Sequence, residues 1–328
     1  MPNSAQDGRT FPRSHGGQGW RWMLVLAWTL LGLGVWAPGA VHAEPVVVLA
    51  LGEEPNGALA FASSLVQLWA RMDDPSPHRL ALSILPNPVD RLRAVQKERA
   101  QFAIVDAFTA LEQVPRLEQV TAMTALWPVV LHPVTRASPQ LEITLPLAQE
   151  TWVFSGGEYA LQYLRERQRL LSPNTPGNPG KAVFAELPEK LKLGGPRLLL
   201  VPAPFPAQEI GAALEQGWEL TPLASAVVQN LKSASNSVVT ALLPKGVYPR
   251  QTRVLELPAA YVFLVGRADL SPLLVRKMLE SVFGRRQAKG IGNPLFAALE
   301  ENVSAVYASQ LTFHPEAAAM LNLPKPKP

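Results

Sequence analysis

The chain has 328 residues, with 30 lysines and arginines against 26 aspartates and glutamates, and a formal net charge of +4. It has no cysteine, which excludes disulfide bonds, thiol catalysis, cysteine-ligated metals and a lipid-modified N-terminal cysteine. The small positive charge is spread along the chain, so nucleic acid is not expected as a partner.

Residues 1–43 have the pattern of a cleavable signal peptide. Three arginines precede the uncharged apolar run 22–36, and Val41 and Ala43 occupy the positions that a signal peptidase recognises. An uncleaved membrane anchor is the alternative, but a span needs about 20 apolar residues, and this run weakens at Pro38. Removing the leader's three arginines and one aspartate lowers the net charge from +4 to +2. We therefore expect an exported, periplasmic or extracytoplasmic protein that is free in its compartment.

The first part of the remaining chain alternates strands and helices. The turn 52–57 leads from the first strand into the first helix, and Asn87 and Pro88 stand at the N-cap and first helical positions of the second helix. The predicted elements are strands at 45–51, 78–85 and 101–108, with helices after 57 and over 86–100. This alternation predicts a parallel sheet with helices on its faces.

Two long extended segments, 119–135 and 253–267, bracket a second α/β unit. That unit contains the strand–turn–helix pattern of 151–167, followed by a helix at 186–195, a strand at 196–203 and a helix at 206–217. Helices are also predicted at 271–283, 294–309 and 315–322. Two crossings around a central unit predict two lobes, the first built from both ends of the chain.

Motifs of catalysis and metal binding are missing from the sequence. The three histidines after the leader stand at unrelated spacings, and no metalloprotease, nucleophile-elbow, phosphate-loop or dinucleotide motif occurs. His132 lies in an apolar extended run, where a hydrogen-bonded structural histidine is the favoured interpretation. We expect no enzyme, no metal and no cofactor, since an exported hydrolase would need a nucleophile–base pair that the sequence does not offer.

Loops that directly follow predicted strands are the candidates for binding, because ligands of open α/β sheets lie outside the carboxyl ends of strands. Ser155, Gly156 and Gly157 lie between an apolar run and a helix start, where unpaired N–H groups favour an anion. The loops are 52–57, 85–89, 106–108 and 155–158. Each alone is ordinary turn chemistry; together, on an exported two-lobed chain, they favour capture of a solute.

The segment 242–283 closely resembles the TAXI family, the extracytoplasmic solute receptors of TRAP transporters. The resemblance is carried by Tyr248-Pro249-Arg250-Gln251 and Gly266-Arg267-Ala268-Asp269-Leu270. More diffuse similarity lies in 92–107, in 124–137 and at His314-Pro315.

The resemblance implies an α/β, two-lobed periplasmic-binding-protein-like fold of type II, each lobe a mainly parallel sheet flanked by helices. Lobe 1 would comprise 44–132 and 255–328, and lobe 2 would comprise 133–254. A monomeric receptor would deliver a small carboxylate-bearing solute, an amino acid or dicarboxylate, to a TRAP membrane permease.

The resemblance also implies which residues face the ligand. It places Gly52, Asp106 and Pro204 at the cleft, Trp127 where a cleft tyrosine packs on the ligand, and Ser155-Gly156-Gly157 as a main-chain cradle for a carboxylate.

The chain departs from the family at several of these positions. Pro88 has no N–H to offer a ligand, Arg91 replaces a ligand-side asparagine, and Asp106 with Phe108 replaces smaller polar residues. Arg91 would grip a carboxylate if it faced the cleft, or be an ordinary charged helix residue if it faced solvent. These departures leave open a second interpretation, a receptor-like module that reports to a sensor kinase or another protein rather than to a permease.

Overall fold

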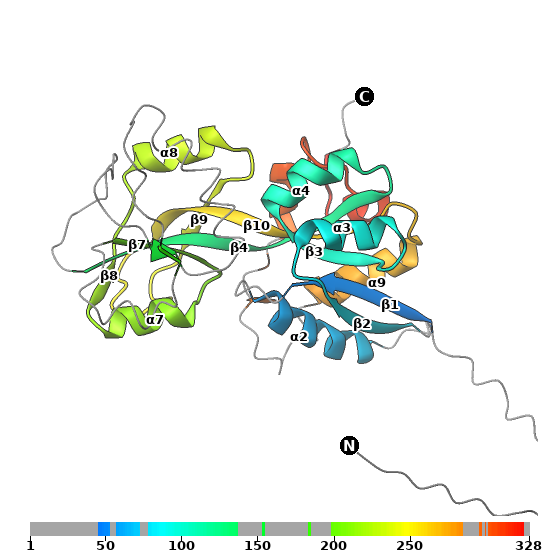
Figure 1. Ribbon diagram of the computed structural model, residues 1–328, viewed down its shortest axis with the longest axis horizontal. Coiled ribbons are helices and arrows are strands. Elements are labelled where there is room, and N and C mark those ends of the chain that lie inside the picture. The colour runs from blue at the N-terminus through cyan, green and yellow to red at the C-terminus, as the bar shows by residue number, and fades with distance from the viewer. Residues whose placement is uncertain are drawn as a thin grey trace, which may run out of the picture. The chain divides into compact units, whose positions relative to one another are not determined.

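The computed structural model, drawn in Figure 1, places Pro45–Pro328 in one compact unit. The described residues are 45–52, 57–72, 78–136, 153–154, 183–184, 198–284, 295–296, 299 and 301–324. The predicted signal peptide 1–43, the Ser155-Gly156-Gly157 turn and the predicted helix 186–195 lie outside them. Among the described residues, no helix combines the length and the apolar character that a membrane crossing needs.

The first half of the fold is the predicted parallel sheet. Its strands are β1 (Val46–Leu51), β2 (Arg79–Ile84) and β3 (Phe102–Asp106), with β1 in the centre and parallel to both neighbours. Its helices are α2 (Ala58–Ala70), α3 (Pro88–Gln96) and α4 (Ala107–Gln113). Asn87 caps α3 as predicted, since its side chain accepts a hydrogen bond from the N–H of Val89 at 2.8 Å. The helix α4 was not predicted, and its first two residues, Ala107 and Phe108, were assigned to the end of the preceding strand.

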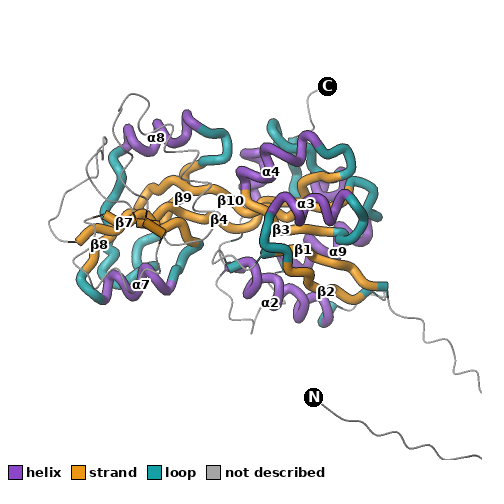
Figure 2. Tube along the Cα trace, viewed as in Figure 1, coloured by secondary structure: helices purple, strands orange, loops and turns teal. Residues whose placement is uncertain are grey.

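Two long strands cross from the first half into the second, as predicted. They are β4 (Val120–Arg136) and β10 (Leu255–Arg267), which pair antiparallel with each other. β10 lies between β3 and β4, and β4 continues to β7 (Leu198–Ala203). One continuous sheet therefore runs through both halves (Figure 2).

The second half repeats the arrangement of parallel strands beside the crossing pair. β7 is parallel to β5 (Val153–Phe154), and β5 is parallel to β6 (Val183–Phe184). Two further strands, β8 (Trp218–Leu220) and β9 (Val239–Leu243), pair antiparallel with β4 and β10. The helices α7 (Gln208–Glu215) and α8 (Ser225–Ala234) lie on opposite sides of the crossing strands (Figure 1). Of these, β6, β8, α8 and β9 were not predicted.

Successive residues of the crossing strands face two different hydrophobic cores. Val130 and Val134 pack with the α7 side chains in one cluster, whereas Val129 and Leu131 belong to the cluster that fills the first half and includes Val228 of α8. This alternation follows from the two-residue period of a strand, whose side chains point to opposite faces in turn. The halves are thus joined by strands that serve both cores.

The C-terminal part of the chain returns to the first half. It forms α9 (Pro272–Phe283), the 3-10 helix η3 (Glu301–Tyr307) and α10 (Pro315–Met320). Ser271 caps α9 through its hydroxyl, which accepts from the N–H of Leu274 at 3.3 Å. Within the predicted helix 294–309, the structure has the 3-10 helix η3 at Glu301–Tyr307. Its buried Ser304 accepts a hydrogen bond from the N–H of Ala125 on β4, which explains why this irregular segment stays against the sheet.

Candidate functional site

The strand registers bring the carboxyl ends of both sets of parallel strands to the same part of the crossing pair. Asp106, the last residue of β3, pairs with Val262 of β10. Ala203, the last residue of β7, pairs with Val130 of β4, which in turn pairs with Ala259 of β10. The two levels are three residues apart along β10, about 10 Å at the rise of a strand. Ligands of open α/β folds bind at such carboxyl edges, so this central segment is the candidate site.

In the first half, the edge is formed by the ends of β1, β2 and β3. Gly52 follows β1 directly and is buried. Gly57 begins α2 with a φ of 83° and gives that helix no side-chain cap. Its positive φ favours glycine there, because other residues are strained in that conformation, and a Cβ would also lie 2.6 Å from the end of the Leu295 side chain.

Arg91 is buried and bonded to the protein itself. Its side chain, which comes from α3, is 2 % exposed. Nε donates to the carbonyl of Leu85 at 2.6 Å, Nη2 to that of Pro86 at 2.5 Å and Nη1 to that of Ile104 at 3.2 Å. The solvent-facing interpretation of Arg91 is therefore wrong, and the bonds show a guanidinium that ties the loop after β2 to β3.

Asp106 is also buried and bonded within its own helix. Its carboxylate caps α4, accepting from both the N–H and the hydroxyl of Thr109 at 2.8 Å. Burial raises the pKa of Asp106, against the opposing effects of the Thr109 hydrogen bonds and the nearby positive charge of Arg91. Asp106, the acidic residue that departs from the TAXI pattern, thus caps the helix α4.

Trp127 stands at the level of the candidate site on β4 but is fully buried. Its ring packs against Phe61 of α2 with centroids 4.7 Å apart, and Phe61 stacks in turn on Phe296 at 4.6 Å. The indole therefore packs on α2 through Phe61.

In the second half, the described part of the edge is the segment that joins β7 to α7. Pro204 follows β7 and is buried, and Ala207 is the N-cap of α7, which has no side-chain cap of its own. Ser155, Gly156 and Gly157 would follow the end of β5 at Phe154, but they lie outside the described residues.

A buried hydrogen-bond chain runs from Ala207 to β7 by way of two side chains that the sequence analysis did not place in the site. The N–H of Ala207 donates to the hydroxyl of Tyr248 at 2.9 Å, and that hydroxyl lies 3.0 Å from Nε2 of His132. Nδ1 of His132 lies 3.2 Å from the carbonyl oxygen of Val201. The predicted structural role of His132 is thereby confirmed. Its partner Tyr248 belongs to the Tyr248-Pro249-Arg250-Gln251 motif, which is the sequence feature that could have identified it.

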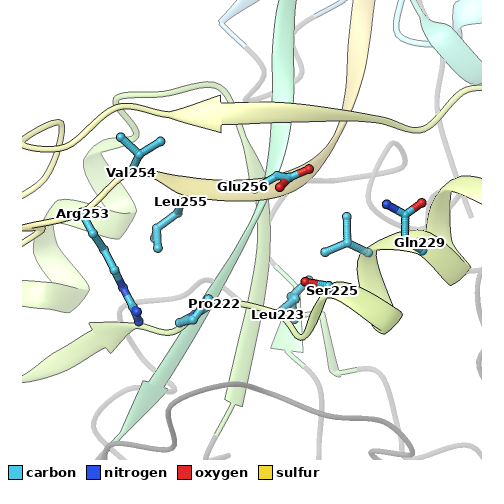
Figure 3. A pocket seen from close by; sticks show the side chains of 9 residues that line it. Pro222, Leu223, Ser225, Gln229, Arg253, Val254, Leu255 and Glu256 are labelled. Carbon is cyan, nitrogen blue, oxygen red and sulfur yellow. The ribbon is translucent and has the colours of Figure 1, made fainter.

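Among the described residues, no group of three or more histidine, aspartate or glutamate side chains could hold a metal ion. A pocket of about 220 Å³ lies elsewhere, between α8 and the start of β10 (Figure 3). Glu256 of β10 and Arg253, which precedes the strand, line it together with Pro222, Ser225 and Gln229. Its position at the first residues of β10 separates it from the candidate site at Ala259–Val262.

No protein-family model matches the chain, and no curated protein matches it. Among solved structures it is similar to the ligand-binding component of an ABC-type import system from Staphylococcus aureus, with 13 % identity, 84 % of this chain and 89 % of that chain covered, and a TM-score of 0.41. It is similar to the periplasmic aliphatic sulphonate binding protein SsuA from Escherichia coli, with 11 % identity, 85 % and 90 % coverage, and a TM-score of 0.45. The BvgS VFT2 domain of Bordetella pertussis gives 13 % identity, 78 % and 94 % coverage, and a TM-score of 0.39.

These likenesses are too distant to carry an argument about ligands. The chain's own strand order defines its class: an α/β, two-lobed fold of the type II periplasmic-binding-protein kind, with parallel strands in each lobe joined by an antiparallel crossing pair.

Proposed function

We propose that the protein is an extracytoplasmic receptor that captures a small carboxylate-bearing solute, an amino acid or dicarboxylate, and passes it to a TRAP-type membrane permease. The observation that carries the proposal is the register: β3 and β7 end within three residues of each other along β10. A solute held there contacts loops from both lobes, which is how hinged receptors enclose their ligands. The leader-like residues 1–43 and the TAXI-like segment 242–283 support export and the TRAP partner.

In its described part, the proposed site would contact the solute through main-chain groups rather than through charged side chains. Gly52 and Pro204 stand directly after strand ends, and we propose that they line the site together with the Ser155-Gly156-Gly157 turn. Arg91 and Asp106 would shape the first-half edge from beneath, because their polar atoms bond to the protein. A ligand carboxylate would then be bound by N–H groups of the second half.

Thermal unfolding with a compound panel tests this proposal. The panel contains the twenty amino acids and the C4–C6 dicarboxylates, each at millimolar concentration. A compound at one hundred times its dissociation constant adds about 2.7 kcal/mol to the free energy of unfolding, which raises the melting temperature of a chain this long by about 5 °C. No shift with any compound would refute the proposal.

Two glycine substitutions localise the effect. Gly52→Val fills the edge after β1 and is expected to abolish the shift. Gly211→Val is the matched control, because a Cβ at Gly211 of α7 meets nothing within 4 Å, and it is expected to leave the shift in place. Equal loss in both variants would contradict the assigned site.

The second candidate is a receptor-like module that reports to a sensor kinase. It is favoured by the internal bonding of Arg91 and Asp106, which stand where the TAXI family offers polar side chains to its ligand. A permease gene beside this one favours transport, whereas a neighbouring kinase gene favours sensing.

A further inference from the structure

The segment from Ala203 to Ala207 forms the described ligand edge of the second half, and it begins a helix without a side-chain cap. The first N–H groups of a helix have no partners within the helix, so the start of α7 depends on bonds from elsewhere. The N–H of Ala207 finds its acceptor in the hydroxyl of Tyr248, 41 residues further along the chain.

The direction of each bond in this chain is fixed by the atoms at its ends. The carbonyl oxygen of Val201 can only accept, so Nδ1 of His132 carries the proton and donates to it. Nε2 of a neutral His132 is then bare and accepts from the Tyr248 hydroxyl. The hydroxyl oxygen keeps a lone pair for the N–H of Ala207. For a neutral imidazole, this is the arrangement of protons that satisfies all three bonds.

The hydrogen-bond chain links the two sides of the end of β7, which is at Ala203. One end is the N–H of Ala207, four residues after the strand, and the other is the carbonyl of Val201, two residues before the end of the strand. His132 is fully buried, Tyr248 is 4 % exposed and Ala207 is 7 % exposed, so water does not replace these bonds. Burial also lowers the pKa of His132 to about 4, which keeps the imidazole neutral near pH 7.

Tyr248 is itself held by the rest of its motif. Oε1 of Gln251 accepts from the N–H of Tyr248 at 3.2 Å, and its Nε2 donates to the carbonyls of Pro244 at 2.8 Å and Arg253 at 3.0 Å. The Tyr-Pro-x-Gln segment thus builds a loop between β9 and β10 whose tyrosine reaches β4 and α7.

We infer that Tyr248 and His132 are positioning residues of the solute site, which fix the main chain of 203–207 in one conformation through this hydrogen-bond chain. The inference rests on the proposed function in one respect, that the segment 203–207 contacts the solute. The hydrogen-bond chain itself is present in the protein without a ligand.

Tyr248→Phe tests the inference, with Tyr307→Phe as the matched control. Tyr307 is a fully buried tyrosine of the first half that takes no part in the hydrogen-bond chain between Ala207 and Val201, so removing its hydroxyl leaves that chain intact. His132→Asn is the second variant, because it keeps a donor for Val201 but offers Tyr248 no acceptor in place of Nε2. It tests the same chain from β4 if Tyr248→Phe does not fold.

Amide hydrogen exchange gives a readout that needs no ligand. Exchange at Ala207 and in the first turn of α7, corrected for global unfolding by the amides of β3, is expected to rise about tenfold in both test variants. It is expected to stay unchanged in Tyr307→Phe. Unchanged corrected exchange at Ala207 in a folded Tyr248→Phe protein would overturn the inference.

Titration with L-glutamate adds the functional readout. Its affinity is expected to fall about tenfold in Tyr248→Phe and His132→Asn, which is a change of about 1.4 kcal/mol, and to be retained in Tyr307→Phe. Equal affinity in all four proteins would overturn the positioning role. If the unsubstituted protein binds neither L-glutamate nor any panel compound, the proposed function fails, and the exchange measurement alone decides the inference.

Discussion

The protonation of His132 should make the stability of this protein fall in acid by an amount that the structure sets. The imidazole is fully buried, and burial lowers its pKa from 6.5 to about 4. Between these two values the unfolded chain binds a proton that the folded chain does not, so the free energy of unfolding decreases as the pH is lowered from about 6.5 to 4. Below pH 4 both states are protonated, and this group causes no further loss.

The size of the effect follows from the two pKa values. A difference of one unit corresponds to 1.36 kcal/mol, so His132 alone removes about 2 kcal/mol at pH 5 and about 3 kcal/mol at pH 4. A loss of this size is a large part of the 5–15 kcal/mol typical of folded domains.

Urea unfolding of the native protein and of His132→Asn at pH 7.5, 6, 5 and 4.2 measures the effect. Other titrating groups are common to both proteins, so they cancel in the difference. The variant is expected to be less stable at pH 7.5, because the hydroxyl of Tyr248 loses its acceptor. The gap should shrink by about 2–3 kcal/mol at pH 4.2. A constant gap, or a His132 that titrates near pH 6.5 in the folded protein by NMR, would refute the reasoning.

Three further substitutions test single contacts, each by urea unfolding. Asp106→Ala should lower the free energy of unfolding by about 1–2 kcal/mol because it removes the cap of α4, whereas Asp106→Asn keeps an acceptor and should lower it less. Because burial raises the pKa of Asp106, the native protein should lose stability as the pH rises above about 4, and the stability of the Asn variant relative to it should increase. An Asn variant as unstable as the Ala variant at all pH values would contradict this. Gly266→Ala should cost about 1–3 kcal/mol, because its Cβ would lie 2.6 Å from Met123 and 2.9 Å from Phe102; unchanged stability would show that both side chains can move. Arg91→Lys should cost at least about 2 kcal/mol, since an ammonium cannot reach three separate carbonyls, and a neutral result would show that the guanidinium bonds contribute little.

The parts of the fold that were predictable from the sequence are those with strong local patterns. The apolar runs of β1 and β10 and the Asn87-Pro88 start of α3 identify their elements without help from the rest of the chain. The short elements β8 and β9 carry three and five residues, too few to show a period. They form because the crossing strands offer them edges to pair with, which no local window contains.

The candidate site was predictable as a place but not as a set of side chains. Strand–loop order locates Gly52 and Asp106 at carboxyl ends, the family resemblance adds Pro204, and the structure describes all three directly at or after strand ends. The sequence could not show that Arg91 of α3 is bonded to carbonyls, since one of them, that of Ile104, lies 13 residues away on β3. For the same reason the pairing of His132 with Tyr248, 116 residues apart, was beyond local reasoning.

The place of β10 in the middle of the first half affects how the chain can fold during its synthesis. β1, β2 and β3 are made within the first 106 residues, yet the strand that covers β3 ends at Arg267. Until then β3 has an open edge, the kind of edge along which strands of separate molecules join and aggregate. The first half cannot complete its sheet before four-fifths of the polypeptide exists, so a factor that shields unfinished chains would help this protein most while the second half is being translated.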